Sequence, residues 1–431
     1  MIENLVKSIV NPLVNDLVPI NSAEYIFDFL SLQTSLPQSL IDLSAAYTRA
    51  GTKHLRQGGV YVEYGANAFG TDLDPVDVEY GYYSETAATN IWTYSTDFTN
   101  AVWVTNQTIG ASGDSAFSGG ASNTVGSSAV FGHKFIRPSI LAGSGVLSTF
   151  SFIVKAVGLR YVSIGRVTTT STVQTWVFDL QDGDIFQTPT SPDYTNGKIV
   201  SIGNGWYRIS VNVNSTTAAI RQCSLYMLSN TPTTPVTNDV SDFTGDGNTG
   251  ILISHAQLET GGRASSPIIT TSSTVTRAAD VLSAPRVNLT TILDSEYAFI
   301  VDHRSDITPT TIQALVNLTD TISFGEFARL YRTDTLSHGK VNSSTFVQAD
   351  ITSANVNASR SKIGLNAQLN NFILAQDGAI SGTDVSGTMP ILPTELQIGH
   401  VQSLSQLNGH IYSLIIKNTS QTQTQLEAAT A

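Results

Sequence analysis

The stretch that most constrains the fold is an Asn-Gly turn followed at once by an alternating run of bulky residues. Asn204-Gly205 opens directly into the run 206–211, Trp-Tyr-Arg-Ile-Ser-Val. An Asn-Gly pair favours the two-residue turn of a β-hairpin, and alternation with a period of two predicts a strand with two different faces. One of Trp206 and Tyr207 should therefore point inward and the other outward. We expect both rings to support the sheet rather than to contact a sugar.

Short strand-like runs separated by Gly, Ser, Asn and Asp turns continue along most of the chain. This spacing predicts an all-β protein with two tandem antiparallel β-sandwich (jelly-roll) domains, and a length of 431 residues favours more than one core. A second Asn-Gly pair at 408–409 predicts another hairpin turn before a final strand, and 422–427 predicts a short helical tail. The expected strands include 149–155, 161–164, 175–180, 250–256, 297–301, 327–331, 372–375, 396–399 and 411–416.

The N-terminal residues follow a different pattern. Residues 2–18 place Ile, Leu and Val at offsets of three and four, which predicts an amphipathic helix that Pro12 should kink. Its apolar stripe could pack on its own domain, on a partner protein, or in a bundle of identical chains. We therefore expect a helical attachment or oligomerisation segment over 1–45 and an irregular β-rich connector over 46–98. The sandwiches should occupy 99–285 and 286–431.

Composition and charge disfavour several classes of partner and site. Only 13% of residues are charged, the net charge is −12, and no basic cluster occurs, so nucleic acid is not an expected partner. No run of eighteen apolar residues predicts membrane insertion, and the N-terminus lacks the pattern of a signal peptide. Cys223 is alone, which disfavours an intrachain disulfide and a cysteine-based zinc site, and we expect a small buried thiol there.

Candidate catalytic and metal-binding groups are better interpreted as structural. The nearest carboxylate pairs, Asp182 with Asp184 and Asp242 with Asp246, lie in Gly-rich turns, where Asp commonly bonds its own backbone. The segment 242–248 holds only part of a calcium loop. Ser115 lies in a Gly/Ser loop without the strand-Ser-helix elbow of a hydrolase, and the seven histidines show no metal-binding spacing. We expect no enzyme activity, no catalytic residue, no metal and no cofactor.

An ordered set of motifs surrounds the 206–211 strand. It comprises Phe-Ser-Phe-Ile-Val-Lys at 150–155, Phe-Asp-Leu-Gln-Asp-Gly at 178–183, Gly-Asn-Gly-Trp-Tyr-Arg at 203–208, Gly-Asp-Gly-Asn-Thr-Gly at 245–250, Ala-Gln-Leu-Glu at 256–259 and Thr-Arg-Ala-Ala-Asp at 276–280. This set resembles a module of bacteriophage tail fibres and other phage appendages. The upstream Thr-Arg-Ala at 48–50 and Thr-Asn at 89–90 fit the same family, whereas 81–85 and Ala88 depart from its pattern.

The resemblance implies a carbohydrate-binding-like β-sandwich over 99–285, and the end of the chain resembles the last strand of a concanavalin-like (laminin G-like) jelly roll over 286–431. It implies an adhesive structural component of a virion, made in the host cytoplasm, that contacts host cell-surface glycans. Fibres of this kind are homotrimers, and residues 1–45 would contact other virion proteins. The alternatives are an architectural head-decoration or baseplate protein and a capsule-degrading tailspike enzyme.

Ligand-binding residues are expected in the last 146 residues, at strand ends or turns where lectin-like loops carry ligands. Sugar binding requires an aromatic ring for the apolar sugar face and amide or other polar groups for the hydroxyls. The candidates that meet these requirements are Tyr331, Asn366, His400 and Asn408.

Overall fold

The chain folds into two compact units, each assembled from segments distant in sequence. The computed structural model describes residues 24–29, 47–138, 146–165, 175–214, 224–232, 242–285, 296–307, 312–320, 325–354, 359–390, 393–402 and 405–431. Unit 1 comprises Met1–Tyr47, Tyr80–Ser84 and Val281–Ala431, and unit 2 comprises Thr48–Glu79 and Glu85–Asp280. Cys223 and residues 1–23, where we expected the amphipathic helix, lie outside the described residues.

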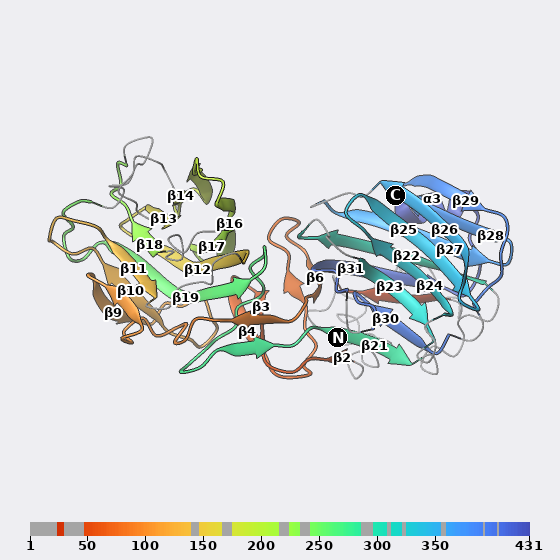
Figure 1. Ribbon diagram of the computed structural model, residues 1–431, viewed down its shortest axis with the longest axis horizontal. Coiled ribbons are helices and arrows are strands. Elements are labelled where there is room, and N and C mark those ends of the chain that lie inside the picture. The colour runs from red at the N-terminus through yellow and green to blue at the C-terminus, as the bar shows by residue number, and fades with distance from the viewer. Residues whose placement is uncertain are drawn as a thin grey trace, which may run out of the picture. The chain divides into compact units, whose positions relative to one another are not determined.

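In the part that the structure describes, unit 1 is a sandwich of two sheets with a short helix near the C-terminal end (Figure 1). Sheet A has the order β29-β28-β27-β22-β31-β6, with β1 also beside β31, and sheet B has the order β21-β30-β23-β24-β25-β26, with β2 beside β21. The bounds in sheet A are β1 Glu24–Asp28, β6 Tyr80–Ser84, β22 Glu296–Ser305, β27 Ser361–Gln368, β28 Asn371–Gln376, β29 Ala379–Asp384 and β31 Gly409–Lys417. Those in sheet B are β2 Tyr47–Thr48, β21 Val281–Pro285, β23 Gln313–Thr319, β24 Phe327–Arg332, β25 Leu336–Ser343, β26 Phe346–Ala354 and β30 Glu395–Ile398, and the helix is α3 Gln423–Thr430.

Unit 2 is also a sandwich. Sheet C has the order β16-β17-β12-β19-β10-β9 and sheet D the order β15-β14-β13-β18-β11-β8. Apolar side chains from both sheets, such as Phe152 and Phe178, form one core. The bounds are β8 Trp103–Thr105, β9 Thr108–Ser112, β10 Ser122–Gly126, β11 Phe135–Pro138, β12 Ser148–Val157, β13 Tyr161–Gly165, β14 Thr175–Asp179, β15 Asp184–Gln187, β16 Tyr194–Gly203, β17 Trp206–Val213, β18 Ser224–Met227 and β19 Gly250–Thr260. Smaller strands are β3 Lys53–Gln57, β4 Val60–Tyr64, β5 Asp72–Leu73, β7 Ala88–Asn90 and β20 Val275–Arg277.

The all-β, antiparallel sandwich class is confirmed, but the units divide the chain differently from the expected domains. The two sheets of the unit 2 sandwich run from β8 to β19, within the expected 99–285, but unit 2 also includes residues 48–79 and 85–98 of the expected connector. One strand of that connector, β6, pairs with β31 in unit 1. Within the expected helical segment 1–45, residues 24–28 form strand β1, because their backbone pairs antiparallel with β31. Among the described residues, no helix is long and apolar enough to cross a membrane.

The two Asn-Gly pairs behave differently. Asn204 and Gly205 both have positive φ, 54° and 78°, and join β16 to β17 as the predicted hairpin turn. The prediction of a hairpin at 408–409 is wrong. Asn408 also has a positive φ of 52°, but β31 pairs with β22 in sheet A whereas the preceding β30 belongs to sheet B. The turn at Asn408 therefore passes the chain from one sheet to the other.

The two aromatic rings of the 206–211 strand pack on opposite faces of sheet C, with Trp206 buried and Tyr207 half-buried. Tyr207 packs against the core between sheets C and D, and Trp206 on the other face is fully buried against Tyr61 and Phe117. Trp206 is buried on that face because the segment that contains Tyr61 packs against it. The indole Nε1 of Trp206 also donates a 3.1 Å hydrogen bond to Asp114. The expectation of a structural role fits these contacts.

A buried charge network joins segments of unit 2 that are distant in sequence. Glu85 and Asp280 are fully buried, and Lys53 lies between them, 3.3 Å from a Glu85 oxygen and 2.5 Å from an Asp280 oxygen. Arg263 and Arg277 contact Glu85 at 3.1 and 3.4 Å. Burial alone would raise the pKa of Glu85, but the charges of Arg277, Lys53 and Arg263 outweigh it and hold that pKa well below its usual range.

The remaining motif residues hold the segment 263–268. Arg208 donates to the carbonyl oxygen of Ser265, and Glu259 accepts a 3.0 Å hydrogen bond from the Ser265 backbone N–H. Gln257 accepts from the Ile268 backbone N–H at 2.7 Å. The Gly-x-Gly-Trp-Tyr-Arg and Ala-Gln-Leu-Glu motifs therefore supply the partners that a buried, irregular segment needs for its polar groups.

Candidate ligand-binding hollow of unit 1

A row of polar residues crosses one face of sheet A. Asp302 on β22 lies opposite Lys362 on β27 and Ser413 on β31, and Asp28 on β1 lies opposite Ser413. Directly paired residues of antiparallel strands point to the same face of a sheet. The turn between β28 and β29 adds Asp377, whose backbone N–H donates to the Lys362 carbonyl oxygen at 2.9 Å. The row therefore takes one polar side chain from each of five chain segments, in the order Asp28, Ser413, Asp302, Lys362 and Asp377.

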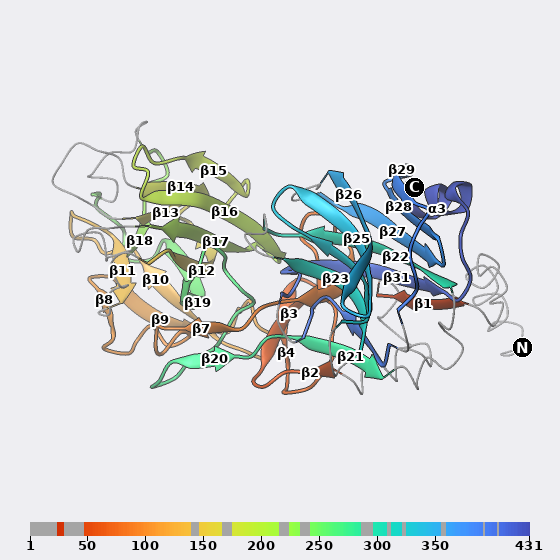
Figure 2. The same cartoon turned by 45° about the vertical axis from the view of Figure 1, so that its right-hand side comes forward.

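The neighbouring row on this face is apolar and carries the helix. Ile300 lies opposite Ile415 and Gly364, and α3 covers this region through Leu426 (Figure 2). A Cβ at Gly364 would lie 2.9 Å from a Leu426 methyl group, so the glycine permits the close approach of the helix. The helix ends with Thr430 at the edge of the polar row, which leaves that row open.

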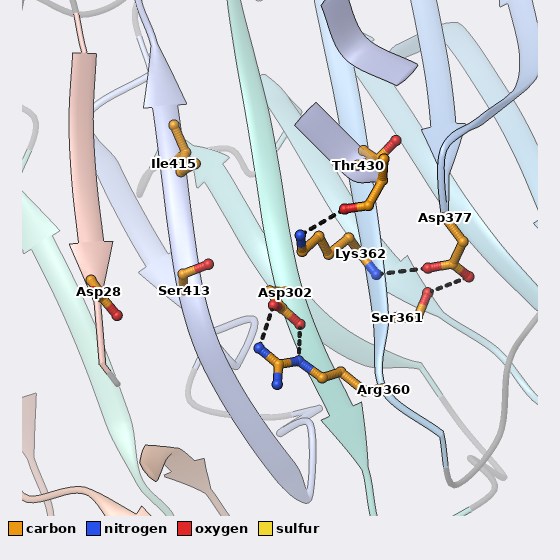
Figure 3. A pocket seen from close by; sticks show the side chains of 10 residues that line it. Asp28, Asp302, Arg360, Ser361, Lys362, Asp377, Ser413, Ile415 and Thr430 are labelled. Carbon is orange, nitrogen blue, oxygen red and sulfur yellow. Dashed lines mark hydrogen bonds and ion pairs between the residues drawn. The ribbon is translucent and has the colours of Figure 1, made fainter. Parts of the chain in front are cut away.

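The polar row lines a hollow of about 660 Å³ (Figure 3). Arg360 enters it with a two-point ion pair: its Nε and Nη2 donate to the two Asp302 oxygens at 2.8 and 2.7 Å. The Arg360 guanidinium also lies 4.2 Å from the centroid of the Tyr412 ring. The Asp302 side chain is 5% exposed and the Arg360 side chain 30%, so the buried carboxylate orients a guanidinium that solvent can reach.

The opposite side of the hollow is also ordered by hydrogen bonds. Asp377 accepts from the Lys362 backbone N–H at 2.9 Å and from the Ser361 hydroxyl at 3.1 Å. The Lys362 ammonium donates to the Ala431 carbonyl oxygen at 2.7 Å. The hollow therefore presents fixed donors beside fixed acceptors, which suits a ligand that carries several hydroxyl groups. Among the described residues, no group of His, Cys, Asp and Glu is arranged to hold a metal ion.

Two of the predicted ligand residues lie on unit 1 strands but outside this hollow. Tyr331 is on β24 of sheet B, where its ring stacks on His338 at 4.4 Å between centroids. Burial raises the pKa of the Tyr331 hydroxyl to about 12. Asn366 is on β27 of sheet A and is fully buried, where it accepts from the Gln421 backbone N–H at 2.5 Å.

The other two predicted residues follow β30. His400 is fully buried, and its Nε2 lies 3.1 Å from the Leu282 carbonyl oxygen. Asn408 donates to the Gln406 carbonyl oxygen at 3.3 Å and is 7% exposed. No hydrogen bond joins any two of the four predicted residues where the structure describes them. Asn366, His400 and Asn408 each have a backbone group of unit 1 as a hydrogen-bond partner.

The carboxylates of the sequence-level pairs have local partners in unit 2. Asp246 accepts from the backbone N–H groups of Asn248 and Thr249 at 2.8 and 2.7 Å, which is the predicted turn role. These backbone bonds lower the pKa of Asp246. Asp182 pairs with Arg160, and Asp242 lies 3.0 Å from His133.

The residues of the hollow were not predicted from sequence. Asp302 lies within β22, where apolar residues precede it, and Asp28 and Asp377 come from segments distant in the chain. The one signal was charge: in a chain with 13% charged residues, the run Asp-His-Arg at 302–304 directly follows the apolar run 297–301 within β22. Only the pairing of β22 with β27, β31 and their neighbours brings the row together.

Comparison with known proteins gives no family. The chain matches no family model, and no curated protein is significantly similar to it. Solved structures similar to it include the CBM40 of a Ruminococcus gnavus sialidase bound to α2,3-sialyllactose, with 14% identity over 33% of this chain and 85% of that one and a TM-score of 0.29. Domain 4 of a Geobacillus stearothermophilus arabinanase, in complex with arabinotriose, has 12% identity, coverages of 40% and 82% and a TM-score of 0.30. The chemistry of the hollow therefore rests on its own residues.

Proposed function

We propose that the chain is an adhesive, non-catalytic protein that binds a cell-surface glycan in the hollow of unit 1. The observation that carries the proposal is the cross-strand polar row with Arg360 fixed by Asp302. Sugar hydroxyls both donate and accept, so they require alternating partners at fixed positions. The rigid sheet supplies those positions, and the Arg360 and Lys362 donors stand beside the Asp377 and Asp28 acceptors.

The finer proposal is that the chain is a tail fibre or related external appendage of a bacteriophage. The ordered motifs of unit 2 and the low content of charged residues support it. In this proposal residues 1–45 attach to other virion proteins, the chain is a homotrimer, and weak glycan contacts repeated over several copies give avidity. Electron microscopy of particles labelled for this protein tests the location. Label at the distal end of an appendage fits adhesion, and label on the capsid contradicts it.

The glycan-binding proposal predicts a large effect of Arg360→Gln. This change removes the oriented donor of the hollow, and hydrogen bonds to charged groups contribute about 1.5 to 3 kcal/mol. We therefore expect affinity for the bound members of a bacterial-surface glycan array to fall at least about 10-fold. Asp302→Asn should weaken binding less, because it loosens the guanidinium without removing it. The array identifies the glycans that the unmodified protein binds, and titration with the most tightly bound glycan then measures the affinity of each variant.

The matched control is Arg160→Gln in unit 2. Arg160 also forms an ion pair with a buried carboxylate: its Nε lies 2.7 and 2.8 Å from the two Asp179 oxygens, its Nη2 donates to Asp179 as well, and its side chain is 29% exposed. Binding should be unchanged in this variant. Undiminished array signal in Arg360→Gln, or equal losses in both variants, would contradict a site in the hollow. A fall in polysaccharide viscosity on incubation with the protein would contradict the non-catalytic role.

A further inference from the structure

Sheet B has a second face that points away from the core of unit 1. A Cβ at Gly339 would lie within 3.0 Å of methyl groups of Leu365 and Leu374 on sheet A, so Gly339 faces the core. Its register partner Leu330 on β24 faces the core as well. Side chains alternate along a strand, so Arg329 points to the opposite face.

On that face a relay of side chains crosses three strands. Asn317 on β23 lies in register with Arg329 on β24 and with Gln397 on β30. The Arg329 Nε donates to the Asn317 oxygen at 2.9 Å, and the Asn317 amide donates to the Gln397 oxygen at 2.8 Å. Asn317 and Gln397 are buried. The relay therefore fixes the Nε edge of the guanidinium and the direction in which its two Nη groups point.

The Arg329 guanidinium lies over an aromatic ring without an acidic partner. Its Cζ is 4.2 Å from the centroid of the Phe327 ring. No carboxylate oxygen of the described residues lies within 4.0 Å of it, and its Nη groups donate to none of these residues. Burial lowers the pKa of Arg329 to about 10, so the group stays charged at neutral pH. On the next strand Lys340, paired with Asp350 at 3.3 Å, adds a second cation to this face.

A half-buried cation without a counter-ion is costly, and a bound anion would offset that cost. The free edge of a guanidinium fits the two oxygens of a carboxylate. We propose that the Nη edge of Arg329 binds the carboxylate of an acidic sugar. This site rests on the proposal that the ligand of the chain is a glycan, but it uses sheet B rather than the hollow on sheet A. It selects acidic glycans, whereas the hollow binds hydroxyl groups.

The test compares three probes on the full chain: oligogalacturonate, its methyl ester and dextran sulfate. The unmodified protein should bind the acid at least 10-fold more tightly than the ester. Arg329→Gln should abolish that preference and leave ester binding unchanged, and Arg329→Lys, which keeps the charge but loses the two-point geometry, should reduce it. The control Arg137→Gln changes a guanidinium that lies 5.2 Å from the Phe135 ring in unit 2, and it should keep the preference.

Several results would overturn the proposal. These are equal binding of acid and ester by the unmodified protein, an acid preference that survives in Arg329→Gln, and tighter binding of dextran sulfate than of oligogalacturonate. Should Arg329→Gln fail to fold, the unmodified protein still gives an answer: the Nε–Hε resonance of Arg329 in NMR spectra must shift with galacturonate and not with its methyl ester. Arg360→Gln separates the two proposals, because it should weaken binding of the ester, which uses the hollow alone, and leave binding of the acid at Arg329 in place.

Discussion

Replacing Glu85 by Gln is expected to destabilise unit 2 by about 3 to 5 kcal/mol, because removal of one partner of a buried ion pair leaves uncompensated charge. Glu85 is fully buried and contacts Lys53, Arg263 and Arg277, and one of its oxygens also accepts from the Ser266 backbone N–H at 2.9 Å. The variant would leave Lys53, Arg263 and Arg277 without the Glu85 charge, while Asp280 is already shared with Arg49. Denaturant unfolding followed by tryptophan fluorescence measures the loss.

This readout is specific for unit 2, because all 4 tryptophans of the chain, at 92, 103, 176 and 206, belong to it. Asp182→Asn is the matched control: Asp182 also pairs with an arginine, but its side chain is 54% exposed, and surface pairs contribute little. Its unfolding midpoint should not move. If the unfolding midpoint of Glu85→Gln equals that of the unmodified protein, the buried charge network is not needed for stability.

The low pKa of Glu85 also gives a pH dependence. A folded-state pKa below the unfolded value means that the contribution to stability is present above about pH 4.3 and is lost as the pH falls through the folded pKa. In that acidic range the unfolded chain binds one more proton at this site than the folded chain. Glu85→Gln removes this difference, so the free energy of unfolding should fall less steeply with decreasing pH, by up to about 1.4 kcal/mol per unit.

The sequence predicted the parts of the fold that depend on local pattern. The Asn204-Gly205 turn and the strand after it are encoded within the ten residues 204–213, so turn chemistry and alternation identify them. At Asn408 the same dipeptide was misread, because its backbone preference fixes a turn but not which sheet the next strand joins. The insertion of β6 into unit 1 depends on pairing with β31, more than 320 positions later, which no local pattern records.

The candidate site was harder to predict than the fold for the same reason. Tyr331 and Asn366 were predicted from residue type and from their position near strand ends or turns, and neither criterion reveals that the backbone N–H of Gln421 uses the Asn366 oxygen. The hollow depends on register instead: a shift of β27 by one residue would move Lys362 to the other face of sheet A and away from Asp302. Lys362 carries no signal in the sequence, and the charged run at 302–304 does not show which residues lie beside Asp302.

Trp206→Ala is expected to destabilise unit 2 by about 3 to 5 kcal/mol, the usual loss for a fully buried Trp, because it leaves a cavity and removes apolar contacts. The ring is fully buried against Tyr61, Phe117 and Ile153, on the face of sheet C that the main core does not cover. The segment bearing Tyr61 should therefore loosen first. Unfolding followed by the three remaining tryptophans, with hydrogen exchange of the β3–β4 hairpin, measures both effects.

Trp206→Phe separates packing from hydrogen bonding at this position. It keeps most of the ring volume but loses the Nε1 donor to Asp114, whose side chain is 44% exposed and also paired with Lys155 at 2.7 Å. Solvent and the lysine can satisfy that carboxylate, so the variant should lose well under half as much stability as Trp206→Ala. Equal losses in the two variants would mean that the hydrogen bond, not the packing, fixes this strand. A negligible loss in Trp206→Ala would show that the cover over sheet C adds nothing to the stability of unit 2.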